Sequence, residues 1–320
     1  MAQGTGNGRG KGEQRELPAW AGPLKSVARL DRFEDEVLGF FAARGMETSM
    51  EDGVVCPAGA TAREMGEHKW GLGNLLQACA RAAEDEWTGL VNRHFEMVLS
   101  AQRATMNIDL DSFDYGVVAS QLVVRLWDQD AFADKAVKDT LIFRRDIPGL
   151  MTVLSMDMPE AVRTVPTTEA EMWGRGRDEL FAAAIENVKR LAEAKTDAHE
   201  LGDGGVVVSV LGDSHFVASL ALSIDSRPEL ISKHGAFVGL PTRHVMLAAP
   251  FGGLDAFKSL QHLIMITRKW CEDGPGSLSP RVWWYREGVW HEIACEVDGD
   301  RLNVTPPPEL VELMNELGGG

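Results

Sequence analysis

The sequence lacks the features that mark disulfide-stabilised, secreted and membrane-spanning proteins. Its four cysteines form no Cys-x-x-Cys pair, so we predict reduced thiols rather than a disulfide framework or a zinc ribbon. Apolar runs such as Gly205 to Leu211 are far shorter than the roughly 20 residues that a membrane helix needs. Residues 1–12 are polar and glycine-rich, without the apolar centre of a secretory signal. We therefore expect a cytoplasmic protein that does not associate with membranes.

Positive charge is also scarce. The chain has 32 Lys and Arg against 48 Asp and Glu, which gives a net charge of −16. A field of this sign repels phosphate backbones, and the densest basic cluster, Arg144-Arg145, is followed directly by Asp146. The sequence therefore predicts no nucleic-acid partner. An acidic surface suits solubility alone, and it also suits a basic protein partner.

Known motifs for metal, phosphate and nucleophilic chemistry are missing as well. Neither His-Glu-x-x-His, Gly-x-Ser-x-Gly nor a Walker loop occurs. Glu64 and His68 have helical spacing but no third partner, and residues 109–114 lack the glycine of an EF-hand loop. Residues 212–215 place Asp, Ser and His in succession, but adjacent side chains on a turn point in different directions. We expect no metal and no cofactor.

What the chain does have is an ordinary globular composition over 320 residues, with 44% apolar and 25% charged residues. Glycine alternating with polar residues predicts a disordered arm over residues 1–28. A helical N-terminal lobe is expected over residues 29–145, and a strand-rich C-terminal lobe over residues 146–317. A loop is expected at residues 109–115.

Apolar spacing of three and four predicts helices, and alternation predicts strands. Helices are expected at residues 30–44, 72–103 (with a break within it), 178–194, 255–271 and 309–317. Extended segments and strands are expected at residues 46–58, 122–127, 141–145, 150–156, 161–165, 206–211, 216–222, 236–240, 244–249, 282–293 and 301–304. Thr168 and Glu171 have the spacing of a capping box. Because helices and strand pairs come in blocks, the fold class is α+β, with helices packed on antiparallel sheets.

Three segments resemble the YtpQ-like family, a group of uncharacterised bacterial proteins. They are residues 150–157 with 162–165 and the helix through Glu186-Asn187-Val188, the strand, proline turn and strand of residues 235–247, and residues 270–293. The resemblance spans most of residues 150–295. It implies a cytosolic bacterial protein, and it supplies no catalytic residues.

The hairpin around residues 282–293 carries three tryptophans. Trp283 and Trp284 must face opposite sides of a strand, and one set can pack beneath the helix of residues 255–271. Residues rich in Trp, Tyr and Arg are typical of protein interfaces. The candidate partner-binding residues are therefore Trp283, Trp284, Tyr285, Arg286 and Trp290. The alternative is that the tryptophans only build the core.

Our leading hypothesis is a non-catalytic binding or adaptor protein that holds a protein partner through this aromatic sheet surface. The alternative is an enzyme whose site is assembled from strand-borne residues distant in the sequence: Asp157, Arg163, His215 and His244. A third hypothesis is a structural subunit of a homo-oligomer.

Overall fold

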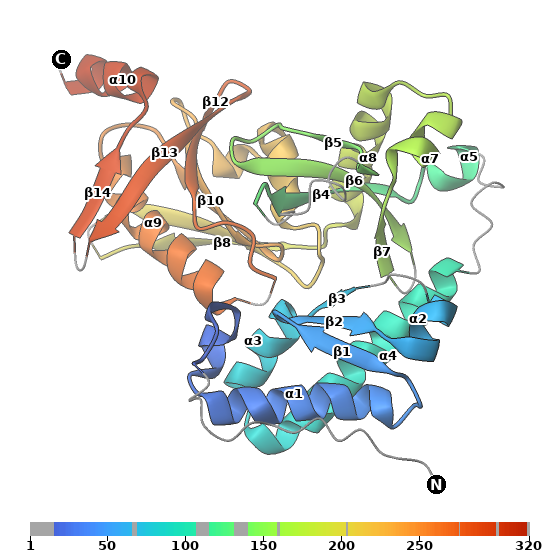
Figure 1. Ribbon diagram of the computed structural model, residues 1–320. Coiled ribbons are helices and arrows are strands. Elements are labelled where there is room, and N and C mark those ends of the chain that lie inside the picture. Colours follow the sequence, from blue (N-terminus) through green and yellow to red (C-terminus); the bar gives the residue numbers. More distant parts are fainter. Residues whose placement is uncertain are drawn as a thin grey trace, which may run out of the picture. The chain divides into compact units, whose positions relative to one another are not determined.

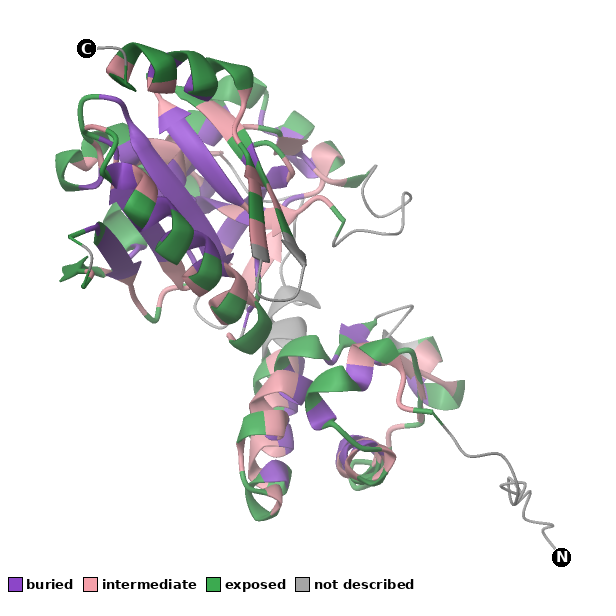
Figure 2. Cartoon of the chain, turned by 90° about the vertical axis from the view of Figure 1, so that its left-hand side faces the viewer, coloured by how far each residue is buried: buried purple, intermediate pink, exposed green. Residues whose placement is uncertain are grey.

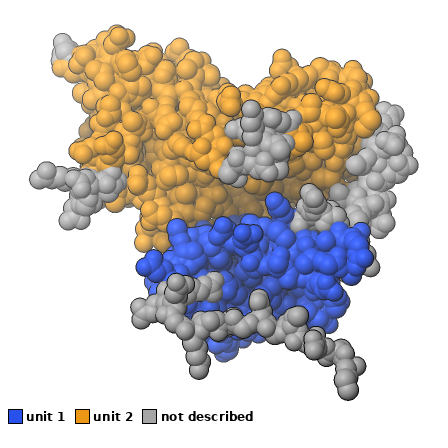
Figure 3. Space-filling view, viewed as in Figure 1, with its two compact units in different colours: residues 1–99 blue, residues 100–320 orange. Residues whose placement is uncertain are grey.

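The computed structural model describes residues 16–65, 69–106, 115–130, 140–158, 161–202, 204–274, 276–298 and 301–318. The chain forms two compact units, Met1–Leu99 and Ser100–Gly320 (Figure 3). Helices and antiparallel sheets occur in both units, so the α+β class is confirmed. Residues 1–15 of the predicted arm, and nearly all of the loop of residues 109–115, lie outside the described residues. The end of the arm is not disordered as predicted, because Ala19–Leu24 form a 3-10 helix that buries Ala21 and Leu24, and the next helix begins at Val27. Among the described residues, no helix combines the length and apolar character that a membrane crossing requires.

The first unit joins helices to a small three-stranded sheet. Its elements are η1 (Ala19–Leu24), α1 (Val27–Ala42), β1 (Thr48–Glu51), β2 (Val54–Pro57), α2 (Gly59–Met65), β3 (Trp70–Gly71), α3 (Gly73–Arg81), η2 (Glu84–Glu86) and α4 (Trp87–Met106), which runs into the second unit. The expected helix over residues 72–103 is thus broken, as predicted. Ser26 begins α1, because its side chain accepts a hydrogen bond from the backbone N–H of Arg29.

An aromatic cluster forms the core of this unit. Phe41 stacks on Trp70 with ring centroids 5.2 Å apart and meets Phe95 edge-on at 4.6 Å. All three rings are buried. Such pairs stabilise by roughly 0.5–1.5 kcal/mol beyond the burial of their area. They tie α1 and α4 to the small sheet.

The second unit is built on a seven-stranded antiparallel sheet (Figure 1). The strand order is β14 (Arg301–Thr305), β13 (Val289–Asp298), β12 (Val282–Arg286), β10 (Ala236–Thr242), β11 (Val245–Pro250), β9 (Val206–Leu211) and β8 (Lys195–Glu200). In Figure 2 its central strands are coloured as buried. Side chains of the central strands point alternately to the two faces of the sheet, and each face has its own core.

Helices α9 (Ala256–Asp273) and α10 (Pro308–Gly318) contribute to the core on one face, with Phe237, Leu247 and Trp284 beneath them. The opposite face places Val238, Met246 and Trp283 in a second core. That core is shared with α8 (Arg177–Leu191), the 3-10 segment η4 (Ala218–Ser226) and the smaller sheet.

The smaller sheet joins β4 (Leu122–Asp128), β6 (Leu150–Met158) and β5 (Phe143–Arg144), and β7 (Ala161–Thr164) pairs with β6. Helix α8 packs on β4, where the buried Asn187 amide donates to the carbonyls of Ala119 and Leu122 at 2.8 and 2.7 Å. The unit also contains α5 (Tyr115–Val118), α7 (Thr167–Met172) and η5 (Pro228–Leu230), of which η5 contacts β11.

Three predictions differ from the structure. Residues 216–222 were expected as a strand but enter the 3-10 segment η4, because a short apolar run fits a buried helix as well as a strand. No capping box forms at Thr168, since α7 already begins at Thr167 after Pro166, which makes no side-chain cap. The two units divide after Leu99 rather than at residue 145, because β4 pairs along its whole length with β6.

Candidate functional site

The aromatic hairpin lies inside the second unit. Trp283, Trp284 and Tyr285 are 0, 1 and 3% exposed. The cause is the position of β12, which lies between β10 and β13 with both faces covered. The indole N–H of Trp283 donates to the Pro148 carbonyl and that of Trp284 to the His234 carbonyl, at 3.0 and 2.9 Å. These side chains therefore offer no surface to a partner in this structure.

Two members of the proposed aromatic surface keep some exposure. Arg286 and Trp290 are half-buried, and the Trp290 ring lies 4.7 Å from that of Tyr285. The phenol of Tyr285 donates to the Asp225 carboxylate. Because the Trp290 ring packs on the buried Tyr285, only parts of Arg286 and Trp290 remain exposed among the five candidate residues.

Arg163 and Asp157 lie on the β6–β7 hairpin, and the Arg163 side chain has a partner within the fold. The Arg163 guanidinium forms a two-point ion pair with Glu169, with distances of 2.7 and 2.6 Å. The Glu169 side chain is 4% exposed, so this pair is nearly dry. Burial raises the pKa of Asp157, whose backbone N–H donates to the Gln121 carbonyl at 2.8 Å. Among the described residues, no hydrogen bond, ion pair or ring contact joins these two residues to the histidine pair.

His215 and His244 do come together, with ring centroids 5.0 Å apart. His244 lies in the turn between β10 and β11, and His215 lies in the loop after β9. Backbone hydrogen bonds fix both segments: the Gly212 N–H donates to the His244 carbonyl, and the Ala218 N–H to the Arg243 carbonyl. The enzyme hypothesis named four residues. Two of them, His215 and His244, form a pair, and Asp157 and Arg163 lie apart from it.

The contacts of His244 set its tautomer. Its Nδ1 lies 3.1 Å from the Ser214 carbonyl, which can only accept, so Nδ1 carries the proton. Its Nε2 then accepts from Nε–H of Arg243 at 3.1 Å. Burial and then the charge of Arg243 lower the pKa of His244, which keeps the ring neutral at pH 7.

Arg125 completes a basic cluster with Arg243, His215 and His244. It lies on β4, and its guanidinium stacks over the Trp127 ring, 4.9 Å from the centroid. Burial and then the nearby charge of Arg243 lower the pKa of Arg125 to about 10. Burial and the same arginines, together with His244, lower the pKa of the more exposed His215 to about 4. The charge of Arg243 therefore disfavours the charged forms of Arg125, His215 and His244.

No described carboxylate lies within ion-pair distance of Arg125 or Arg243. Of the other half-buried arginines of the same unit, five have such a partner and Arg268 does not. The five are Arg144 with Asp146, Arg163 with Glu169, Arg227 with Glu229, Arg281 with Asp128 and Arg286 with Glu287. In a chain with sixteen more acidic than basic residues, two neighbouring arginines without an acid are a specific feature.

Gly276 makes room for Arg243. Its φ of +71° is in the left-handed region, and a Cβ there would lie 2.7 Å from Nε of Arg243. The Gly276 carbonyl also accepts a hydrogen bond from the Arg243 backbone N–H at 3.0 Å. The loop after α9 therefore positions the arginine side chain.

An open cavity of about 960 Å³ begins at His244 and Ser214. It extends between the end of α8 and the first residues of β8. Its rim carries Lys195 and three carboxylates, from Glu193, Asp197 and Asp213. Through His244, one member of the basic cluster lines a space large enough for a small organic molecule.

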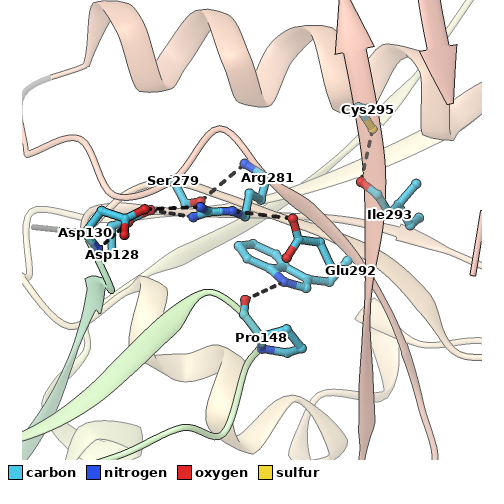
Figure 4. Close-up of polar contacts among 9 residues, drawn as sticks. Asp128, Asp130, Pro148, Ser279, Arg281, Glu292, Ile293 and Cys295 are labelled. Atoms are coloured by element: carbon cyan, nitrogen blue, oxygen red, sulfur yellow. Dashed lines mark hydrogen bonds and ion pairs between the residues drawn. The ribbon is translucent and has the colours of Figure 1, made fainter. Parts of the chain in front are cut away.

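A second charged group links the two sheets (Figure 4). Arg281 contacts Asp128 at 2.6 Å, Asp130 at 3.6 Å and Glu292 at 3.4 Å. Gly149, with φ of +76°, allows its guanidinium to approach. The positive charge of Arg281 is compensated by these carboxylates. We therefore interpret the group as a structural link between the two sheets and not as a ligand site.

Sequence reasoning identified the histidines of the basic cluster but missed Arg125 and Arg243. Arg243 follows Pro241 and Thr242 in a recognised turn, and an arginine in that turn next to a histidine was the available signal. Arg125 interrupts an apolar strand, and we read it only as part of that strand. Among the described residues, no group of three or more His, Cys, Asp or Glu side chains is arranged to hold a metal ion.

No family model, curated protein or solved structure matches this chain. The YtpQ-like resemblance therefore stays a prediction.

Proposed function

We propose that this protein binds a small molecule through a negatively charged oxyanion group, held by Arg125, Arg243 and His215, with His244 positioning Arg243. The observation that supports the proposal is the pair of neighbouring, half-buried arginines with no described carboxylate partner. Burying positive charge without a counter-charge costs free energy. A bound anion supplies the missing counter-charge.

The donors of the cluster fit an oxyanion. The Nε–H of Arg243 is taken by His244, which leaves its terminal N–H groups for a ligand. Arg125 contributes a second planar set of donors, and the exposed His215 contributes a third group at the entrance. Guanidinium groups match the two-point geometry of phosphate and carboxylate.

The surroundings favour a small molecule over a polymer. The net charge of −16 repels a nucleic-acid backbone, and three carboxylates line the neighbouring cavity. A small ligand has one anionic group to place in the cluster and needs no extended basic track. We propose binding and assign no reaction to the site.

We infer that binding takes place in the cytoplasm. All four cysteines are free, and burial raises the pKa of Cys79 to about 12 and those of Cys271 and Cys295 to about 11. Thiols in this state are unreactive and suit a reducing compartment. This inference does not depend on the identity of the ligand.

Isothermal titration calorimetry with inorganic sulfate and phosphate tests the proposal, at constant ionic strength set with chloride. We expect saturable binding to the full chain, and at least a tenfold loss of affinity in Arg243→Gln. The matched control is Arg145→Gln, which removes an equal charge from an exposed residue of the same unit. Equal affinity loss in both variants, or no saturable binding of either anion, would overturn the proposal.

A further inference from the structure

Strand β8 forms one edge of the seven-stranded sheet, and all six of its side chains are exposed. It pairs with β9 on its inner side along its full length, from Lys195 opposite Leu211 to Glu200 opposite Val206. In the part of the chain that the structure describes, no strand pairs with its outer side. Such an edge presents free backbone donors and acceptors to another strand.

The hairpin that joins β8 to β9 determines which residues point outward. The N–H of Leu201 donates to the Gly205 carbonyl at 2.8 Å, so Leu201 points its backbone groups inward. Inward and outward residues alternate along an antiparallel strand. The outer edge therefore presents the N–H and C=O groups of Thr196, Ala198 and Glu200.

We propose that two copies of this chain associate through β8, antiparallel, with Ala198 facing Ala198 across a two-fold axis. In this register the outward groups of Thr196 meet those of Glu200 from the second copy. About six backbone hydrogen bonds then join the two sheets into one. The contact is isologous, because the same six residues serve both copies.

The side chains of β8 are complementary to themselves in this register. Asp197 lies opposite His199 of the second copy, in a pair without backbone hydrogen bonds, where side chains are closest. The Ser209 hydroxyl donates to the Asp197 carbonyl at 3.4 Å and therefore accepts from the Nε2–H of His199 at 2.8 Å, so Nδ1 donates to the carboxylate when the ring is protonated. Two such Asp–His pairs form, one on each side of the axis.

The other face of β8 is complementary as well. The Arg227 guanidinium donates to Oγ1 of Thr196 at 3.2 Å. Glu200 of the second copy lies opposite Thr196 and therefore next to this positive charge. At the centre, Ala198 is small enough for two strands to meet without a clash.

One neighbouring register is excluded by charge. A shift of the axis to Asp197 places the two Asp197 carboxylates directly opposite each other, which is destabilising. The proposed register instead places each acid opposite a histidine or beside an arginine. Charge thus favours the proposed alignment over the one with its axis at Asp197.

Sedimentation velocity on the full chain, from micromolar to near-millimolar concentration, tests the proposal with the variant Ala198→Pro. Proline removes an outward N–H, which an edge strand tolerates, while the β8–β9 hydrogen bonds remain. We expect a monomer–dimer equilibrium in the natural sequence and a monomer at every concentration in the variant. A circular dichroism melt confirms that the variant is folded.

Two charge variants make the test independent of Ala198→Pro. Asp197→Lys places a lysine opposite His199, and His199→Asp places two aspartates opposite each other, so each variant alone should dimerise at least tenfold more weakly. Mixed together, they pair Lys with Asp and His with Asp, and a heterodimer should form. Glu312→Lys, at an exposed position of α10, is the control for the change in net charge. A monomeric natural sequence, a dimer that survives Ala198→Pro, or a mixture without a heterodimer would each overturn the proposal.

Discussion

The Nε–H group of Arg243 donates to Nε2 of its neighbour His244 over 3.1 Å. The imidazole can accept because its proton is held on Nδ1 by the Ser214 carbonyl. A neutral histidine thus fixes an arginine without neutralising it. This arrangement keeps a positive charge on Arg243, and that charge lowers the pKa values of Arg125 and His215.

Replacing Arg125 by methionine should stabilise the protein and weaken anion binding at the same time. The methionine keeps an apolar stem over Trp127 and removes a half-buried charge that Arg243 opposes. We expect a gain of about 1 kcal/mol in the free energy of unfolding. Sulfate affinity should fall at least tenfold. Urea unfolding and calorimetry measure the two effects.

A gain in stability together with a loss of sulfate affinity would show that Arg125 serves a ligand site and not the fold. If Arg125 served only the fold, its removal would lower stability. Arg163→Met is the comparison, because Arg163 has a buried carboxylate partner and its loss should destabilise. A destabilised Arg125→Met variant with unchanged sulfate affinity would contradict our interpretation.

Acidification should act in opposite directions on the free and the sulfate-bound protein. The folded pKa of His215 is lowered to about 4 and that of His244 is also lowered, so between about 6.5 and 4 the unfolded chain binds more protons. Stability without ligand should therefore fall through this range. A bound anion favours the protonated rings, so sulfate affinity should rise as the pH falls.

Sulfate suits this measurement because it keeps its charge across the range, whereas phosphate takes up a proton. The control is the double variant His215→Gln with His244→Gln, in which the gain in affinity at low pH should disappear. A sulfate affinity that is independent of pH in the natural sequence would show that neither imidazole contacts the anion.

The Arg163–Glu169 pair should contribute to stability and not to binding. Glu169 is 3% exposed, so Glu169→Gln leaves a nearly buried guanidinium without its counter-charge. We expect a loss of about 3–5 kcal/mol in the free energy of unfolding and no change in sulfate affinity. The double variant Arg163→Met with Glu169→Leu should recover part of that loss. A stability unchanged by Glu169→Gln would show that the pair is not dry in solution.

The sequence predicted most of the second unit because its strands alternate clearly and its turns carry Pro, Gly and Asp. Alternation also predicted that Trp283 and Trp284 face opposite sides, and this is confirmed by their separate cores. What alternation does not reveal is which faces are covered. The hairpin looked like an interface because nothing local indicates that β12 is a central strand.

The basic cluster was only half predictable for a related reason. His215 and His244 attract attention as residue types with chemistry, but Arg125 is distant in the sequence and joins them only through the packing of β4. Arg163 and Asp157 attracted equal attention, and the fold uses Arg163 for an internal ion pair. Without the long-range contacts, a paired and an unpaired arginine look alike.

The three tryptophans of the hairpin should differ in their contribution to stability. Trp283 is fully buried, and its indole N–H donates to the Pro148 carbonyl, so Trp283→Ala opens a cavity and leaves that acceptor unpaired. We expect a loss of about 3–5 kcal/mol for Trp283→Ala and a similar loss for Trp284→Ala, measured by urea unfolding. Trp290 is half-buried against Tyr285, and its replacement should cost about 1 kcal/mol. An unchanged stability in Trp283→Ala or Trp284→Ala would contradict the burial of these rings in two cores. The hairpin would then again be a candidate surface for a protein partner.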